Sequence, residues 1–579
     1  MLRRTILFVF FLLAFTTKGF SLEFYVSSFA DGNGDGSIEK PWALQQAFNA
    51  PQALHLPQDT IWIWLKGGVY TNTFNTQTSF NCFTNGTATS PIIFRNYKNE
   101  RATIDSQLPN TIIFGLGNCS FTWLWGVEIM NSSSFDRDHS NINRLGNVYC
   151  TAEQIKFINL IVHDMGSGLD SWKTAKNSET YGCIIYNIGN NLQNGINWEG
   201  HGHGMYLQND TVGTKRIHDN IVFSTYGFGI RVWQTTTTDA IGNFDIQRNI
   251  VFNGGAASEN LGGVGNNSRT HNFFVVSNSI NNPIRNTVIK HNLTYAGVNT
   301  PRPPVNAFGL NYGVDHMVLD SNFMTCQTRL GFNNTPIFNA SVRGNTFIAG
   351  IPAIYGYFLW GFSNVDFPAN QYFSQQPDTG LNYFIYPNKY EKNRAHWVIY
   401  NWEGAPSVQI PLGEANLEKG DIYELVNVMD YYNDIILDTI LDQNFVSVPM
   451  TGHSMAPVIG SSKEPVNQFP FFGVFVLRKI GNTTVSTTKE EPTHLTLNIY
   501  PNPGHSEVTV QCLLPQHGFY HLDMVDVTGK TIVLNENRFF KAGEQNFILD
   551  IKHLLSGHYT IRMFNSYMLG SISFIKIDY

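Results

Sequence analysis

The residues best suited to chemistry lie between positions 168 and 233 of the 579-residue chain. Three segments there begin with glycine and then alternate apolar and polar residues: Gly168-Leu-Asp-Ser-Trp172, Gly204-Met-Tyr-Leu-Gln208 and Gly229-Ile-Arg-Val-Trp233. In a strand, alternate side chains point to opposite faces. Neighbouring strands of this kind would carry one outward ladder of a carboxylate, a phenol and a guanidinium, from Asp170, Tyr206 and Arg231. A second outward ladder, two residues further on, would contain Trp172, Gln208 and Trp233.

Two histidines precede the middle segment, in the stretch Trp198-Glu-Gly-His201-Gly-His203-Gly-Met-Tyr206. Lys215 follows on the next expected strand. Only 14% of the chain is charged, so this concentration of titratable and aromatic groups singles out the region.

One chemistry that fits is β-elimination of a uronate sugar. It requires that a carboxylate be neutralised, an α-proton be removed and a leaving oxygen be protonated. We assign these roles to Arg231, His203 and Tyr206. Sugars stack on indole faces, and the side chains expected to bind substrate are Trp172, Trp233, His201, Gln208 and Lys215.

Other interpretations stay open. Hydrolysis requires two carboxylates that flank the bond, and Asp170 could act with Glu199, Asp210 or Asp219. A non-catalytic glycan-binding surface protein would keep the tryptophans and not need His203 or Tyr206, and a uronan epimerase would use similar groups. His203 could also simply fill a corner of the fold, Asp170 and Arg231 could be a solvated pair, and a loop could cover the tryptophans.

A repeat indicates the elements that position these residues. Short apolar segments recur at intervals of 23 to 43 residues, and their aligned third positions are Asn159, Cys183, Asn220, Asn249, Asn292, Asn322 and Asn345. Asparagine tolerates the left-handed conformation at a bend, and stacked amides hydrogen-bond to one another. Repeats of this length that stack on their neighbours predict a solenoid with a continuous core.

The first coils resemble a known superfamily. The segments Asp59-Thr-Ile-Trp-Ile-Trp-Leu-Lys-Gly-Gly-Val-Tyr70 and Ser90-Pro-Ile-Ile-Phe-Arg-Asn-Tyr97 are similar to those of pectate-lyase-like proteins. The resemblance implies an all-β chain with a right-handed parallel β-helix over residues 22–379. It also allows calcium as a cofactor, although no cofactor is certain and the Gly/Asp-rich run at 31–36 fits a turn better than an EF-hand loop.

The rest of the chain has a different pattern. Residues 380–480 contain alternating strands typical of a small β-sandwich, and resemble accessory domains of carbohydrate-active enzymes. A polar linker is expected at 481–493. Residues 494–579 contain Tyr500-Pro-Asn-Pro503 and resemble the Ig-like β-sandwich that serves as the C-terminal sorting domain of the type IX secretion system. That resemblance implies the secretion machinery as a partner.

Composition and the N-terminus agree with export. Aromatic residues reach 14% and there are 50 glycines, which favours β-structure. Residues 1–21 fit a signal peptide, and no later run is long and apolar enough to span a membrane. With a net charge of -7, the chain lacks the positive charge typical of nucleic-acid-binding proteins. Six cysteines leave any disulfide pairing open.

These observations predict a monomer exported across both membranes of a Gram-negative bacterium, secreted or held at the cell surface. The expected activity is degradation of an extracellular polysaccharide. A polysaccharide lyase that cuts a uronate-containing glycan is the first choice, and a glycoside hydrolase is the second.

Overall fold

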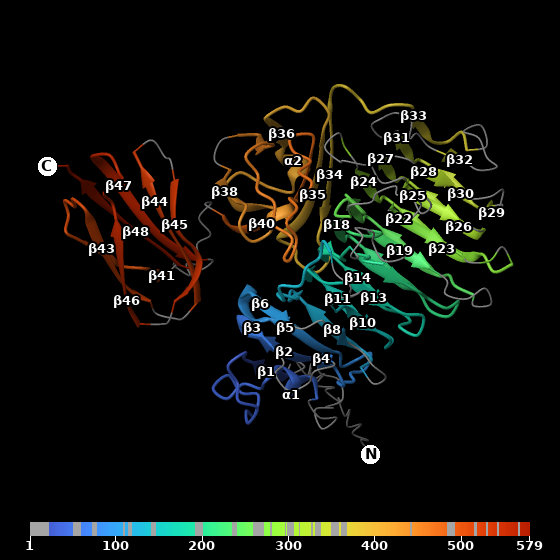
Figure 1. Ribbon diagram of the computed structural model, residues 1–579, viewed down its shortest axis with the longest axis horizontal. Coiled ribbons are helices and arrows are strands. Elements are labelled where there is room, and N and C mark those ends of the chain that lie inside the picture. Colours follow the sequence, from blue (N-terminus) through green and yellow to red (C-terminus); the bar gives the residue numbers. More distant parts are fainter. Residues whose placement is uncertain are drawn as a thin grey trace, which may run out of the picture.

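The computed structural model of the chain (Figure 1) shows parallel strands stacked into three long sheets, followed by antiparallel sheets. It describes residues 22–578 except 50–59, 72–77, 108–110, 114–118, 140–145, 192–200, 234–239, 259–270, 278, 280, 296, 298–305, 312, 326–327, 331–336, 349–357, 360–366, 441–442, 483–492, 515–517, 528–530, 541–542 and 566–567. The expected signal peptide lies outside the described residues.

The three parallel sheets form the sides of a β-helix, and we name them A, B and C. Sheet A contains β1 (Leu22–Val26), β2 (Ile61–Leu65), β5 (Ile92–Asn96), β8 (Thr122–Trp125), β11 (Lys156–Ile158), β14 (Glu179–Tyr181), β17 (Lys215–His218), β20 (Phe244–Gln247), β23 (Ile284–Lys290), β26 (Val314–Asp320), β29 (Ile337–Phe338) and β30 (Ser341–Arg343). Sheet B contains β3 (Gly68–Tyr70), β6 (Ala102–Asp105), β9 (Glu128–Met130), β12 (Ile161–His163), β15 (Ile184–Ile188), β18 (Ile221–Thr225), β21 (Ile250–Phe252), β24 (Leu293–Tyr295), β27 (Phe323–Thr325), β31 (Thr346–Ile348) and β33 (Gln371–Phe373). Sheet C contains β4 (Thr78–Asn81), β7 (Thr111–Ile113), β10 (Val148–Cys150), β13 (Leu169–Ser171), β16 (Met205–Leu207), β19 (Ile230–Trp233), β22 (His271–Val276), β25 (Asn306–Asn311), β28 (Thr328–Leu330) and β32 (Phe358–Leu359).

From β2 to β28 each coil runs through sheets A, B and C in turn, so consecutive strands of this stretch belong to different sheets. Alternation within the strands fills the interior; in β2, for example, Ile61, Ile63 and Leu65 are buried while the two tryptophans between them are half-buried. Each fully buried aliphatic side chain contributes about 1.5–3 kcal/mol. The short helix α1 (Leu44–Phe48) lies near the N-terminus, and Leu44, Ala47 and Phe48 join the same core.

A stack of buried asparagines marks the bend between sheets A and B. The amide nitrogen of each residue donates to the amide oxygen of the next at 2.8–2.9 Å, through Asn220, Asn249, Asn292, Asn322, Asn345 and Asn370. The predicted hydrogen bonding is confirmed. The left-handed residue, however, is the one before the asparagine, at Asp219 (φ 57°), Arg248 (φ 53°), His291 (φ 54°), Ser321 (φ 56°) and Gly344 (φ 66°).

The predicted alignment of Asn159 is wrong by one residue. Ile158 pairs with Tyr181, and Tyr181 pairs with His218. Asn159 therefore corresponds to the left-handed residue of its bend and has a φ of 50°. Its side-chain oxygen accepts a hydrogen bond from Asn388 at 2.9 Å instead of joining the stack. Both positions of the bend favour asparagine, so composition alone could not separate them.

Antiparallel strands follow the β-helix. One sheet contains β34 (Leu381–Pro387), β35 (Arg394–Asn401), β40 (Phe472–Asn482), β37 (Asp421–Asn427) and β38 (Ile435–Thr439), and a second pairs β36 (Ser407–Pro411) with β39 (Phe445–Pro449) beside α2 (Leu412–Ala415). We call this the accessory unit. It lies alongside the β-helix in Figure 1.

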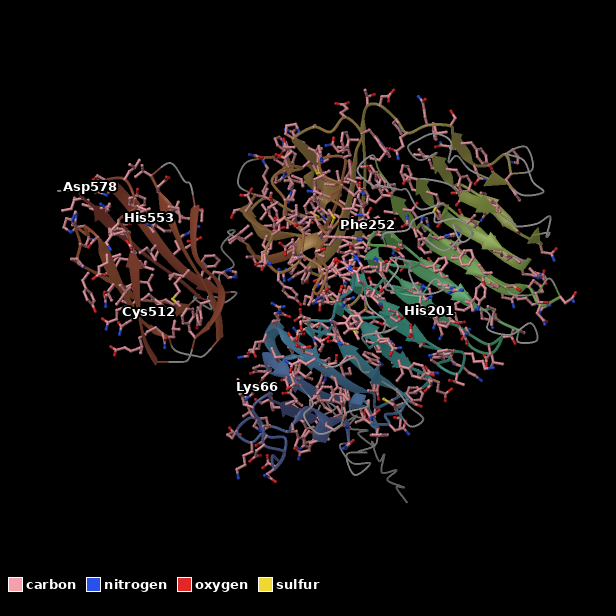
Figure 2. All side chains as sticks on the ribbon, in the orientation of Figure 1. Lys66, His201, Phe252, Cys512, His553 and Asp578 are labelled. Carbon is pink, nitrogen blue, oxygen red and sulfur yellow. The ribbon has the colours of Figure 1, made fainter. Side chains whose placement is uncertain are left out.

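The accessory unit covers the outer face of sheet B with aromatic packing. Tyr186, Phe223 and Phe252 form a stacked row with centroids 4.9–5.1 Å apart, and Phe472 of β40 lies 4.2 Å from Tyr295 and 5.2 Å from Phe252. Figure 2 labels Phe252 where the two parts meet. Around these residues the outer face of sheet B is therefore covered by protein.

The C-terminal strands form two further sheets, at the left of Figure 1. They are β41 (Thr493–His494), β42 (Leu497–Tyr500), β43 (Glu507–Leu514), β44 (Gly518–Asp526), β45 (Thr531–Phe540), β46 (Gly543–Asp550), β47 (Gly557–Asn565) and β48 (Met568–Lys576). The predicted fold class, a parallel β-helix followed by antiparallel β-structure, is confirmed, whereas the residue boundaries of the domains stay predictions. No helix in the described residues is long and apolar enough to cross a membrane.

Candidate active site

The outer face of sheet C carries the predicted ladder. Strand pairing places Asp170 opposite Tyr206, and Tyr206 opposite Arg231. The residues predicted to point inward, Leu169, Met205 and Ile230, are all completely buried. Figure 2 shows His201, which flanks this face, on the coils in the middle of the β-helix.

Glycines shape the corner between sheets B and C. A Cβ atom added to Gly204 would clash with Cγ1 of Val222, and one added to Gly229 would clash with Cγ1 of Val251. These glycines therefore let the chain turn closely over the core. Close packing thus explains why each predicted segment begins with glycine. The residue before the glycine, such as His203, lies at the start of the outer face.

Arg231 lies in the middle of a group of rings. Its Nη1 is 3.1 Å from Nε2 of His203, and its guanidinium carbon is 4.2 Å from the ring centre of Trp233 and 4.9 Å from that of Phe228. A guanidinium can only donate hydrogen bonds, so Nε2 of His203 must accept. Nε2 therefore carries no proton in this arrangement, and Nδ1 lies 3.4 Å from the backbone nitrogen of Phe228.

This contact bears on the role predicted for His203. The side chain is 2% exposed, and the ring lies 5.8 Å from that of Tyr206 in a nearly parallel arrangement. The lone pair that would take a substrate proton points at Arg231. His203 can act as a base only when the guanidinium has turned towards another partner.

Asp170 is held within the fold. Its carboxylate accepts hydrogen bonds from Nδ2 of Asn147 and from Oγ of Ser167, the latter at 2.7 Å, and the residue is 3% exposed. The structure therefore places it on the predicted face, with both oxygens engaged by neighbouring side chains.

The carboxylates considered as partners of Asp170 lie elsewhere or are engaged. Asp219 occupies the bend between sheets A and B, and both its oxygens accept hydrogen bonds from Arg248, at 2.7 and 2.6 Å. Burial raises the pKa of Asp219 despite that pairing. Asp210 pairs with Lys176 at 3.0 Å. Glu199 lies outside the described residues.

The second predicted ladder is present, with an unpredicted addition. Trp172 and Gln208 follow β13 and β16, and Nε2 of Gln208 donates to the phenol of Tyr206 at 3.0 Å. The ring of Trp172 lies 5.5 Å from Tyr206 and 5.5 Å from Tyr149. Tyr149, which pairs with Asp170 in the sheet, extends the aromatic row by one coil. In the sequence, the alternating segment Val148-Tyr-Cys150 could have indicated that Tyr149 points outward. That alternation becomes informative only once the register between coils is known.

The prediction that Lys215 meets a ligand is wrong for its position in this structure. The side chain is fully buried, and Nζ donates to Oγ of Ser171 at 2.6 Å and to the carbonyl of Trp172 at 2.9 Å. Burial lowers the pKa of Lys215 to about 7. Lys215 occupies an inward position of β17, whereas its neighbour Arg216 is exposed. It supports the end of β13 from inside the coil.

A metal centre finds no support among the described residues, where no three His, Cys, Asp or Glu side chains are grouped suitably. In the run at 31–36, carboxylate oxygens of Asp31 and Asp35 accept backbone hydrogen bonds from Asn33 and Ser37, each at 2.9 Å. Those contacts are the ones expected of turns.

Comparison with known proteins identifies the C-terminal part. Residues 498–571 match the family described as "Secretion system C-terminal sorting domain". The chain is therefore addressed to the type IX secretion system and is a secreted or cell-surface protein. No curated protein matches the chain. Among solved structures, "Crystal structure of pectate lyase Pel9A" is similar over 57% of this chain and 80% of that one, with 14% identity and a TM-score of 0.37.

Proposed function

We propose that this exported chain degrades a uronate-containing polysaccharide by β-elimination, on the outer face of sheet C. The observation that carries the proposal is Arg231, a half-buried guanidinium set between His203 and the ring of Trp233 on an exported β-helix. A cation flanked by aromatic faces suits a sugar ring that bears a carboxylate.

The steps follow from the contacts of Arg231. A bound uronate carboxylate competes for the guanidinium and draws it away from Nε2 of His203. The pairing withdraws charge from the carboxylate and makes the α-proton more acidic. Nε2 of His203 then takes that proton.

Tyr206 completes the elimination. As the double bond forms between the α- and β-carbons, the bond to the leaving sugar oxygen breaks, and the phenol donates its proton to that oxygen. Gln208 donates to the same phenol oxygen at 3.0 Å, which holds the hydroxyl in place. Trp172 and Trp233 offer faces for the sugars on either side.

The test is a panel of uronate-containing, neutral and sulfated polysaccharides, incubated with the full chain with and without chelator. Reducing ends and the ultraviolet absorbance of a conjugated double bond are followed together. Both signals rising with the same glycan supports elimination. New reducing ends without ultraviolet absorbance would mean hydrolysis and refute the proposal. If neither signal rises with any glycan, the result favours a non-catalytic binding protein.

Variants assign the roles. Arg231→Gln should lower kcat/KM by about 10²–10³-fold, as expected when one electrostatic contact to developing charge is lost. Tyr206→Phe and His203→Asn should each lower kcat by about 10²–10⁴-fold. Arg216→Gln, an exposed arginine on sheet A, is the matched control and should leave activity unchanged.

A further inference from the structure

A second aromatic surface lies at the N-terminal end of sheet A. Trp62 and Trp64 project from β2, and Trp123 projects from β8, two strands away; Trp62 and Trp123 share one ladder with Ile93 between them. We call these three residues the tryptophan strip. All three are half-buried, and the rings of Trp62 and Trp64 are nearly parallel with centroids 5.2 Å apart. Three adjacent indoles at a water-facing surface need an explanation.

The neighbouring Trp125 shows how the same sheet treats an indole that is covered. The turn after β34 lies over it, with Tyr390 at 5.5 Å, and its Nε1 donates to Glu391 at 2.8 Å. In the described part of the chain, no acceptor faces the indole nitrogens of the tryptophan strip. The strip therefore offers three ring edges with N–H donors that a ligand can use.

The cations beside the strip are already paired. Lys156 lies 4.1 Å from the ring centre of Trp123 and 3.5 Å from Glu179. Arg95 lies over Trp125 and 3.5 Å from Glu391. Charge at this surface is thus balanced, in contrast to the face around Arg231. The matching ligand is an uncharged one that combines apolar faces with hydroxyl groups.

We infer that the tryptophan strip binds a neutral polysaccharide chain that runs along the axis of the β-helix. Trp62 and Trp123 are two strands apart, about 10 Å at the usual strand spacing, which is on the order of the length of a disaccharide. One sugar ring would stack on each indole, and the N–H groups would donate to hydroxyls. The inference does not depend on the function proposed for sheet C.

A protein partner fits this surface less well. Three half-buried indoles have on the order of 200 Å² left to cover, judged from the full area of an aromatic side chain. A stable dimer buries about 800 Å² on each partner. A single sugar chain needs no more area than the strip offers.

The experiment is affinity electrophoresis of the full chain in native gels that contain hydroxyethylcellulose, galactomannan, arabinoxylan or, as acidic glycans, pectin or alginate. Co-sedimentation with insoluble cellulose and chitin extends the neutral set. At least one neutral polysaccharide should retard or sediment the wild-type protein. The double variant Trp62→Leu/Trp123→Leu should bind at least about tenfold more weakly. Phe373→Leu, at an exposed aromatic residue of β33 in sheet B, is the matched control and should bind that neutral glycan like the wild type.

Several outcomes overturn the inference. They are failure to bind every neutral polysaccharide, equal binding by the double variant, loss of binding in Phe373→Leu, or self-association that the double variant abolishes. Circular dichroism and thermal melting show whether the double variant is folded. If it is not, the single variants Trp64→Leu and Trp123→Leu decide, and wild-type affinity in both overturns the inference equally.

Discussion

Replacing Glu128 by glutamine should loosen the contact between the β-helix and the accessory unit. Glu128 is 2% exposed on β9. Arg101 donates to both of its oxygens at 2.7 and 2.8 Å, and Nε2 of His163 lies 2.9 Å from one of them. Tyr432 of the accessory unit covers the guanidinium of Arg101, 3.6 Å from the ring centre. The carboxylate thus orders a charged cluster beneath the accessory unit.

The size of the effect follows from the charges left behind. Burial would lower the pKa of His163, but hydrogen bonds to Asp164 and Glu128 raise it to about 9. A rise from 6.5 to about 9 corresponds to about 3 kcal/mol, shared between the two carboxylates. Removing one partner of a buried pair costs about 3–5 kcal/mol. We therefore expect Glu128→Gln to lower the free energy of unfolding by about 2–4 kcal/mol.

The pH dependence gives an independent check. A raised pKa for His163 stabilises the fold fully below pH 6.5, and this contribution is lost as the pH rises through about 9. Hydrogen bonds from His163 and Arg101 outweigh burial and lower the pKa of Glu128 to about 2. Its contribution is complete above pH 4.5 and is lost as the pH falls towards 2. Stability from this cluster should be greatest between about pH 4.5 and 6.5.

Urea denaturation followed by near-ultraviolet circular dichroism measures both effects, at pH 6 and at pH 9.5. Glu391→Gln is the matched control, since Glu391 also joins the two parts but its pair with Arg95 is about one quarter exposed. The control should lose about 1 kcal/mol or less. The difference in stability between the wild type and Glu128→Gln should shrink from pH 6 to pH 9.5 as His163 loses its proton. Equal losses in the two variants, or a difference that is the same at both pH values, would refute the reasoning.

Three further predictions concern the coils, each checked by urea denaturation. Asn292→Leu should cost about 2–4 kcal/mol, because the buried amide makes four hydrogen bonds to the neighbouring coils; a loss under 1 kcal/mol would contradict the stack. Burial lowers the pKa of Lys215 to about 7, so its ammonium group makes the unfolded chain bind more protons between pH 7 and 10.5. The wild type should therefore gain stability relative to Lys215→Met as the pH rises over that range, and a constant difference between the two proteins would contradict this. Gly204→Ala should cost about 1–3 kcal/mol because its Cβ would clash with Val222, whereas Gly413→Ala, with open space around the added carbon, should cost little.

The sequence was most informative where one interaction repeats in every coil. The glycine-led segments fixed the register of β13, β16 and β19, since a one-residue error would place the apolar Leu169 outside and the charged Asp170 in the core. The recurring asparagines indicated the coil spacing, because the same hydrogen bond repeats from one coil to the next. Asn159 was misplaced because two adjacent positions of that bend both accept asparagine.

Other features depend on contacts between distant segments and leave no local signal. Lys215 was predicted to bind substrate, and lysine is rarely buried, yet three oxygens at the end of β13 solvate its ammonium group inside the coil. The sequence likewise did not indicate which sheet the accessory unit covers. Tyr186, Phe223 and Phe252 alternate with core residues like any outward ladder, and only the placement of Phe472 shows that protein covers them.

The three faces of the β-helix therefore differ in what they leave open, and this difference carries the functional argument. Sheet B is filled by the accessory unit. Sheet A is covered near Trp125 but leaves the tryptophan strip half-exposed, with its neighbouring cations paired to carboxylates. Sheet C keeps a guanidinium against a histidine nitrogen, a contact that a carboxylate ligand can replace. A neutral sugar chain and an acidic one would thus meet different faces of one rigid body. Arg231→Gln should therefore lower cleavage by about 10²–10³-fold without weakening neutral-glycan binding at the tryptophan strip. Trp62→Leu/Trp123→Leu should weaken that binding and leave cleavage of a soluble uronate substrate unchanged.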